Sequence, residues 1–443
     1  MNHTHPVLHK IPETTALYQI YLRNYTKEGT FRSAISKLDE IKQLGCSWVY
    51  ITPIHPIGKQ NRKGSLGSPY AIQDYRAINP ELSTLADFQA FIDAVHNAGL
   101  KLMIDVVFNH TAPDSVLAQQ HPEWFMKAAN GSAGRKCADW SDVIDFDYMS
   151  NASQSGLWNE LIDTLDYWRT LGVDGFRCDV ASLIPVDFWE QARLHINRYN
   201  DTTARDDRPT LWLAESVHPS FIIKLREMGY NAWSDPEIHR AFDLSYDYDG
   251  FEILEQVWAG QKNITAYLDH VQLQQALYPA SAQKIRFLEN HDQKRAAWRF
   301  KDIDMLKAWT LFYQFLPGHT FVYMGQEWGI SDYPSLFEKQ PVPWETKNNE
   351  FYTFFTHCFS LTQQIKTHKT AFSYTAYGDG IILLTRRGEH TQWHALCNLN
   401  AHKGYITIPG TISGKELFEN KHITLSGKIM LPENCLLIEE ALH

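Results

Sequence analysis

Short apolar runs alternate with longer amphipathic segments along most of the chain. The apolar runs, with the polar residues that close some of them, lie at residues 17–22, 48–53, 101–110, 172–180, 211–215, 284–292 and 319–327. Between them, apolar residues recur every three or four positions, as one face of a helix requires, at residues 31–44, 85–98, 157–171 and 186–199. Residues 230–248 are less regular and are expected to hold the sixth strand with its loop. Strands that alternate with helices predict an α/β fold with a parallel sheet.

The pattern changes in two places. Between residues 110 and 147 it breaks up into short polar pieces, and a connection of this length inside a compact domain is usually functional. From residue 371 onward, alternating apolar and polar residues separated by turn residues predict a small antiparallel β domain. We therefore expect a short insert after the third strand and a separate C-terminal domain.

Four of the apolar runs close on charged or polar side chains. Arg177 and Asp179 are two positions apart, so a strand places both on the same side, where the arginine favours the ionised carboxylate. The other three runs close on Asp105 with His110, on Glu215, and on Asp292 with His291. One isolated Arg-x-Asp pair is typical of a structural ion pair, but charge at the ends of several parallel strands is how a (β/α)₈ TIM barrel builds an active site. We therefore predict such a barrel.

The four stretches resemble the conserved regions of the α-amylase family, glycoside hydrolase family thirteen. The resemblance covers nearly the whole chain. It implies that Asp179 is the nucleophile, Glu215 the general acid/base and Asp292 the carboxylate that stabilises the transition state. It also implies that Arg177 orients and ionises Asp179.

Further site residues follow from the same resemblance. They are the substrate-binding Tyr70, His110 and His291 and the supporting Asp74 and Asp105. Tyr70 lies in residues 64–75, which resemble the G-Y-x-x-x-D-Y segment of the family, and its ring would stack under the sugar in the cleavage subsite. A tyrosine in a glycine-rich loop can equally be a packing residue, so both interpretations of Tyr70 stay open.

The resemblance makes calcium a candidate cofactor, and no other cofactor is expected. In the family a calcium ion bridges the insert to the third strand through oxygen ligands, which hard cations require. The candidate ligands here are Asn109 and Asp147. Many α-amylases carry a Lys-His pair soon after the nucleophile, where this chain has Ser182 and Leu183. A backbone carbonyl can replace that of the histidine, but the loss of the lysine removes a substrate contact.

The resemblance also divides the chain into domains. We expect the catalytic barrel, domain A, at residues 1–110 and 148–370, the inserted domain B at residues 111–147, and a C-terminal β-sandwich, domain C, at residues 371–443.

Composition narrows the possible partners. A net charge of −10 argues against a nucleic acid or an anionic membrane as partner and fits a neutral α-glucan or oligosaccharide. No window of about 18 apolar residues is present, and residues 1–6 lack the basic start and apolar core of a leader peptide. The six cysteines have no metal-ligand spacing and are expected to be reduced thiols. We therefore expect a cytoplasmic protein; the sequence does not indicate its oligomeric state.

These features predict a retaining α-glucoside hydrolase that cleaves α-1,4 linkages in maltooligosaccharides or starch fragments. Two carboxyl groups give retention when they lie about 5–5.5 Å apart. Val180, which follows the expected nucleophile, is frequent in α-1,6-acting and transferring branches, so an oligo-1,6-glucosidase or a glucan transferase stays an alternative. The alternatives outside this chemistry are an inactive carbohydrate-binding protein and a metal-dependent hydrolase. The presence of all three carboxylates argues against the first, and the absence of H-x-H spacing at strand ends argues against the second.

Overall fold

Eight parallel strands close into a barrel at the centre of the computed structural model, which describes residues 6, 8–128, 131–202 and 209–442. Around the barrel the strands follow the order β1-β10-β9-β8-β7-β6-β3-β2. They are β1 (Ala16–Ile20), β2 (Trp48–Ile51), β3 (Lys101–Val106), β6 (Gly175–Cys178), β7 (Leu211–Ala214), β8 (Leu244–Tyr246), β9 (Gln283–Arg286) and β10 (His319–Tyr323). The predicted (β/α)₈ barrel is confirmed. Residues 1–5, which entered the expectation of no leader peptide, lie outside the described residues.

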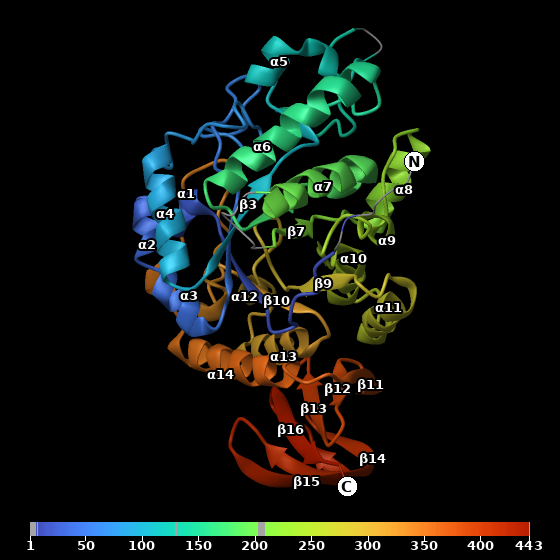
Figure 1. Ribbon diagram of the computed structural model, residues 1–443. Coiled ribbons are helices and arrows are strands. Elements are labelled where there is room, and N and C mark those ends of the chain that lie inside the picture. Colours follow the sequence, from blue (N-terminus) through green and yellow to red (C-terminus); the bar gives the residue numbers. More distant parts are fainter. Residues whose placement is uncertain (1–5, 7, 129–130, 203–208, 443) are drawn as a thin grey trace.

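Helices cover the outside of the barrel (Figure 1). The longer ones are α4 (Leu85–Asn97), α6 (Trp158–Thr170), α7 (Val186–Thr202), α8 (Pro219–Glu227), α10 (Tyr248–Trp258), α11 (Ile264–Leu277), α13 (Ile303–Phe315) and α14 (Asn349–Lys366). The shorter ones are α1 (Leu22–Tyr25), α2 (Phe31–Ile35), α3 (Leu38–Leu44), α9 (Asp235–Ile238) and α12 (Ala296–Arg299). Of the helices in the described ranges, none is both long and apolar enough to span a membrane.

The single helix expected at residues 31–44 is two helices, α2 and α3. At the break, the Ser36 hydroxyl donates to the Ser33 carbonyl at 2.9 Å, and the Lys37 amide donates to the Ala34 carbonyl at 3.0 Å. These bonds span three residues and compete with the regular four-residue bonds of an α-helix. The apolar spacing is kept across the break, because Phe31, Leu38 and Ile41 are all buried.

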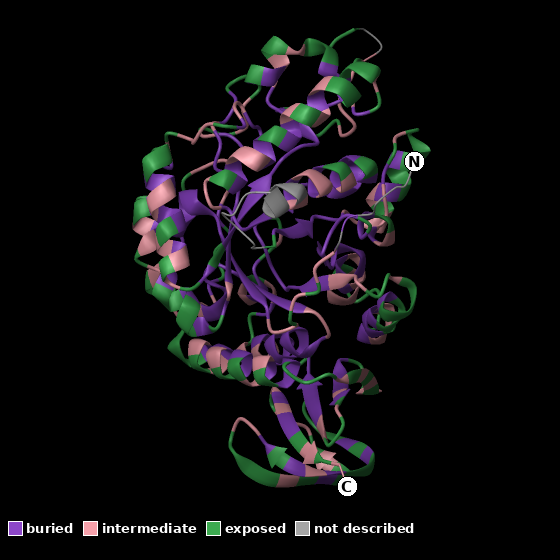
Figure 2. Cartoon of the chain, viewed as in Figure 1, coloured by how far each residue is buried: buried purple, intermediate pink, exposed green. Residues whose placement is uncertain are grey.

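The core lies between the strands and the inner faces of the helices, which Figure 2 shows as a nearly continuous buried layer. Large aromatic side chains fill it. Trp189 on α7 contacts Trp212 on β7 edge to face, with ring centroids 6.4 Å apart, and both rings are fully buried. The strand ends near the insert are different, because charged side chains are buried there.

The insert after β3 is small and joined to the barrel by a two-stranded sheet. Its strands are β4 (His110–Thr111) and β5 (Ile144–Asp145), which pair antiparallel, and between them lies α5 (Val116–Gln120). Because β4 begins at His110, the insert starts directly beside a predicted site residue.

The C-terminal domain is one antiparallel sheet with the strand order β11-β12-β13-β16-β14-β15. Its strands are β11 (Ala371–Gly378), β12 (Ile381–Arg387), β13 (Thr391–Asn398), β14 (Tyr405–Glu416), β15 (Lys421–Met430) and β16 (Cys435–Ala441). One hydrophobic cluster joins Leu383 and Leu396 in the middle of the sheet to Ile408 and Leu425 in the β14–β15 hairpin. The side chains of the β14–β15 hairpin therefore pack against those of β12 and β13. All six strands are nevertheless hydrogen-bonded in a single sheet.

Arg386 on β12 connects this domain to the barrel. Its guanidinium donates to the carbonyls of Phe315 and Leu316 at 2.8 Å each and forms an ion pair with Glu13 at 2.6 Å. Only 2% of the Arg386 side chain is exposed. Removing it would take a donor from two backbone carbonyls and the ion-pair partner from Glu13, which would keep the hydrogen bond from the Gly318 N–H.

We expect Arg386→Met to lower the free energy of unfolding by about 3 kcal/mol, because charge-assisted hydrogen bonds to buried partners are lost. Thermal unfolding followed by circular dichroism measures this effect. Arg387→Met is the matched control, since Arg387 is the next residue on the same strand and is exposed. Equal unfolding temperatures for the two variants would contradict the role of Arg386.

Candidate active site

Arg177 lies at the centre of the charged cluster at the carboxyl ends of the strands. The register of the barrel pairs it with Asp105 on the neighbouring strand β3. One guanidinium nitrogen, Nη1, donates to both oxygens of Asp105 at 2.9 and 3.0 Å and to Oδ1 of Asp179 at 2.9 Å. The other, Nη2, lies 3.0 Å from Oε2 of Glu215. One arginine therefore holds three carboxyl groups together.

The sharing of one positive charge changes the expected ionisation of Asp179. From the sequence, Arg177 alone is expected to favour the carboxylate. In the structure, burial and the nearby Glu215 raise the pKa of Asp179 well above its usual range, and the opposing effect of Arg177 is the smaller one. The expectation was incomplete because it left out the burial of Asp179 and the neighbouring Glu215, which together outweigh Arg177. Three carboxylates around one guanidinium would leave excess negative charge, so the cluster tends to keep a proton.

Glu215 is held through one of its two carboxyl oxygens. Oε2 binds Arg177 and accepts the backbone N–H of Val180 at 2.7 Å. In the described part of the chain, Oε1 accepts no hydrogen bond. Val180 has a φ of 36°, which is rare for a β-branched residue and costs conformational energy. This strained turn follows Asp179 directly and aims the Val180 N–H at Glu215.

Asp292, the third carboxylate, approaches the cluster from the loop after β9. Its side chain is 37% exposed, and its Oδ2 lies 3.2 Å from Nε2 of His291. His291 is buried, and its Nδ1 lies 2.7 Å from the Gln19 amide nitrogen. The loop therefore anchors His291 in the protein and leaves Asp292 open to the solvent side.

Tyr70 connects two parts of this cluster. Its hydroxyl donates to Oδ2 of Asp105 at 3.0 Å and contacts Nε2 of His291. Its ring stacks on the His291 ring with centroids 5.4 Å apart. The hydroxyl of Tyr50 donates a second hydrogen bond to Oδ2 of Asp105 at 2.5 Å. Tyr70 therefore packs against the cluster and lines the open space above it.

The two histidines are neutral hydrogen-bonding groups. Burial is the main cause that lowers the pKa of His110 to about 3 and that of His291 to about 3. Nearby positive charges, Lys136 for His110 and Arg177 for His291, act in the same direction. Nε2 of His110 lies 3.8 Å from Oδ2 of Asp179. Both rings therefore stay uncharged at neutral pH.

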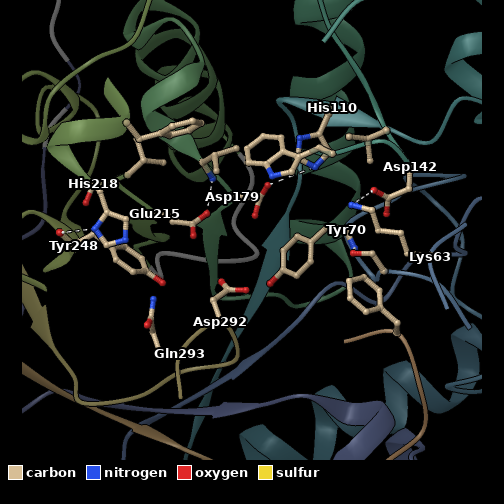
Figure 3. Close-up of a pocket in the computed structure, with 18 residues that line it drawn as sticks. Lys63, Tyr70, His110, Asp142, Asp179, Glu215, His218, Tyr248, Asp292 and Gln293 are labelled. Atoms are coloured by element: carbon tan, nitrogen blue, oxygen red, sulfur yellow. Dashed lines mark hydrogen bonds and ion pairs between the residues drawn. The ribbon is translucent and has the colours of Figure 1, made fainter. Parts of the chain in front are cut away.

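A cavity of about 360 Å³ lies above the carboxyl groups. Asp179, Glu215 and Asp292 point into it from three different loops (Figure 3). Tyr70 and His110 line it as well, while Arg177, His291 and Asp105 lie buried beneath it. The structure thus brings together eight of the predicted site residues.

Several cavity-lining residues were missed from the sequence. Trp140 lies against His110 with ring centroids 5.4 Å apart and near Phe221 at 6.2 Å. Lys63 and Asp142 form an ion pair of 3.0 Å at the side of the cavity. Lys63, Trp140 and Asp142 belong to loops, where no apolar period marks them, while Phe221 lies on α8. Only their position in the long polar insert, for Trp140 and Asp142, could have drawn attention to them.

Three predicted residues lie outside this group of eight: Asp74, Asn109 and Asp147. Asp74 accepts the backbone N–H of Arg76 at 3.0 Å. Asp147 accepts a hydrogen bond from the backbone N–H of Met149 at 3.1 Å, and the side-chain oxygen of Asn109 accepts one from the ammonium of Lys136 at 2.8 Å. Within the described residues, no three His, Cys, Asp or Glu side chains are grouped as metal ligands. Each of the two expected calcium ligands therefore accepts a hydrogen bond from a protein donor.

Known proteins resemble this chain over most of its length. Residues 19–144 and 141–369 match the family described as "Alpha amylase, catalytic domain". The crystal structure of an alpha-amylase from Lactobacillus plantarum superposes with a TM-score of 0.88 at 37% identity, covering 97% of this chain and 99% of that one. A noncanonic maltogenic alpha-amylase, AmyB from Thermotoga neapolitana, gives a TM-score of 0.83 at 29% identity over 97% and 99% of the two chains.

Curated relatives include enzymes of two kinds. An alpha-1,4-glucan:maltose-1-phosphate maltosyltransferase from Myxococcus xanthus is 35% identical over 196 residues, 40% of this chain. The alpha-amylase MalA from Haloarcula japonica is 29% identical over 334 residues, 72% of this chain. The chain spans only 29% and 44% of the lengths of these two relatives.

The raised pKa of Asp179 has a consequence for stability. A folded-state pKa above the unfolded value means that the folded protein binds more protons, so stability is lost as the pH rises from about 4 through the raised pKa. We expect Asp179→Asn to keep the fold and to unfold at a higher temperature than the parent protein, with a gap that widens between pH 4.5 and pH 7.5. Thermal unfolding across this range measures the gap.

Glu433→Gln is the control, because this carboxyl group is exposed and lies between β15 and β16 of the C-terminal domain. Its effect should not depend on pH. An Asp179→Asn variant that is less stable than the parent by the same amount at every pH would contradict the ionisation described above.

Proposed function

The chain belongs to the α-amylase family of glycoside hydrolases, and from this we propose that it is a retaining hydrolase of α-1,4 linkages in maltooligosaccharides or starch fragments. One observation carries the proposal: Arg177 binds both Asp179 and Glu215 at the base of one open cavity. Sharing a guanidinium keeps the two carboxyl groups close together. Retention requires such closeness, because one carboxylate must reach the anomeric carbon while the other reaches the leaving oxygen.

In the proposed first step, a carboxylate oxygen of Asp179 attacks the anomeric carbon and the glycosidic bond breaks. Glu215 gives its proton to the leaving oxygen, and a covalent glycosyl ester forms on Asp179. Oε1 of Glu215 suits this proton, because Oε2 already accepts hydrogen bonds from Arg177 and Val180. In the second step Glu215 takes a proton from water, which displaces the sugar and restores both carboxyl groups.

The other residues would stabilise charge and orient the sugar. Asp292 remains exposed to the cavity, where its charge favours the positive character of the oxocarbenium-like transition state. His110 and His291 are neutral, so they can bind sugar hydroxyls without adding positive charge near the reacting carbon. Tyr70 offers a ring face beside them.

A neutral substrate fits the cavity better than a phosphorylated one. Among the lining residues that the structure describes, Lys63 is the only lysine or arginine, and it is paired with Asp142. Three carboxyl groups face the same space and would repel a phosphate group. This argues against a maltose-1-phosphate donor, which the names of the maltosyltransferase relatives specify. An inactive binding protein is disfavoured, because the three carboxyl groups converge on one cavity.

A second candidate is transfer of the glycosyl unit to another sugar, or action on α-1,6 linkages. Val217, Phe221 and Trp140 give one side of the cavity an apolar surface. An apolar wall can stack a sugar acceptor and exclude water, which favours transfer over hydrolysis.

We propose a cytoplasmic location, with which the six free thiols agree.

The test is a time course of products from maltoheptaose, with panose and isomaltose in parallel. We expect short maltooligosaccharides from maltoheptaose whose new reducing ends are first released in the α configuration, as seen by proton NMR. Asp179→Asn and Glu215→Gln should each lower the rate by about 10⁴-fold or more, because each removes an essential reacting group. Circular dichroism should show an unchanged fold.

Glu389→Gln serves as the control and should retain the parent rate. Products that form first in the β configuration, or wild-type turnover in either carboxyl variant, would refute the mechanism. Cleavage of only the α-1,6 substrates, or products longer than the starting sugar, would favour the second candidate.

A further inference from the structure

Lys136 lies between the insert and the barrel. Its ammonium donates to the side-chain oxygen of Asn109 at 2.8 Å and to the backbone carbonyl of Leu183 at 3.1 Å. Its backbone N–H donates to Oδ2 of Asp145 at 2.7 Å. The lysine belongs to the insert, Asn109 follows β3, and Leu183 lies in the 3₁₀ turn (Ala181–Leu183) after Asp179. One side chain therefore joins three segments that surround the cavity.

The surroundings of this ammonium are those of a bound cation. Burial lowers the pKa of Lys136, and the carboxylates of Asp145 and Asp147 oppose that shift. The second oxygen of Asp145, Oδ1, is buried and accepts no hydrogen bond within the described residues. Side-chain oxygens, a backbone carbonyl and carboxylates are the ligands that a hard divalent cation prefers. Here a lysine nitrogen already occupies the position that two of these oxygens face.

We propose that the Lys136 ammonium replaces the calcium ion that the family resemblance places between the insert and the third strand, so that the fold of this protein does not depend on calcium. The ammonium and an ion would compete for the Asn109 oxygen and the Leu183 carbonyl. A divalent ion needs about six to eight oxygens at about 2.3–2.6 Å, and a lysine at hydrogen-bond distance from two of them leaves no room for it.

The same contacts connect Lys136 to two residues that line the cavity, His110 and Val180, through their chain neighbours. Asn109 precedes His110, and its side-chain nitrogen lies 3.1 Å from Nδ1 of that histidine. Leu183 ends the turn that begins at Val180, whose N–H holds Glu215. Loss of the ammonium would loosen both segments without touching the reacting carboxyl groups.

An ion could reach this position if the lysine were shortened. A cavity of about 250 Å³ opens beside Lys136 and is lined by Asp147 and Leu183 among others. In Lys136→Ala, the space of the butyl-ammonium side chain would join this cavity, and the oxygens of Asn109, Leu183 and the two aspartates would face it without a cation. That variant should bind calcium where the parent protein does not.

The experiment measures thermal unfolding of the full chain in EDTA and in 5 mM calcium chloride. The parent protein should unfold at the same temperature, within about 1 °C, in both buffers. Lys136→Ala should unfold several degrees lower in EDTA, and calcium should restore part of that loss. Lys127→Ala is the control for the loss of a positive charge, since Lys127 lines the same cavity but, within the described residues, its ammonium donates to the Pro122 carbonyl and not to Asn109 or Leu183. It should behave like the parent.

Two results would overturn the proposal. One is a parent protein that EDTA destabilises and calcium restores. The other is a Lys136→Ala variant whose unfolding temperature is the same in both buffers, which would mean that the lysine does not stand in the place of an ion. If Lys136→Ala does not fold, the parent protein in the two buffers still decides the question. None of these readouts depends on the activity proposed above.

Discussion

The single positive charge of Arg177 is shared by three carboxyl groups, and the arrangement of the cavity depends on that sharing. Barrel register places Arg177 beside Asp105, and the next turns of chain bring Asp179 and Glu215 to the same guanidinium. Burial and the nearby Glu215 raise the pKa of Asp179 well above its usual range, and one positive charge does not balance three carboxylates, so we expect the cluster to keep a proton. The buried arginine thus serves two purposes, because it fixes the geometry of the carboxyl groups and opposes the rise that burial causes in the pKa of Asp179.

The protein stabilises this unfavourable cluster through the surrounding structure. Val180 adopts a strained left-handed conformation in which its N–H donates a hydrogen bond to Glu215. The hydroxyls of two tyrosines donate hydrogen bonds to Asp105. The buried Trp189 supports the turn at Val180, because its indole N–H donates to the carbonyl of Ala181, directly after Val180, at 3.3 Å. The insert adds a second layer, because Lys136 holds the segments of Asn109 and Leu183 against the barrel.

Much of the fold and of the site could be predicted from the sequence, because alternation along a strand fixes the side to which each side chain points. Arg177 and Asp179 had to share a face, and polar residues that close parallel strands had to meet at one end of a barrel. The remainder depended on contacts between segments far apart in sequence. No local pattern reveals that Arg177 also binds Glu215, that Lys136 reaches Asn109, or that Trp140 covers His110. The helix break at Ser36 was missed because side-chain hydrogen bonds do not alter the apolar period.

The most direct test of the central claim is to trap the sugar on the enzyme. A 5-fluoro-α-glycosyl fluoride reacts quickly with a retaining enzyme and leaves slowly, so the covalent ester accumulates and can be found by mass spectrometry of the digested protein. The account predicts one added glycosyl unit on the peptide that carries Asp179. A glycosyl unit on Glu215 or Asp292 would contradict it, because the carboxyl group that Arg177 holds beside Glu215 would then not be the one that attacks.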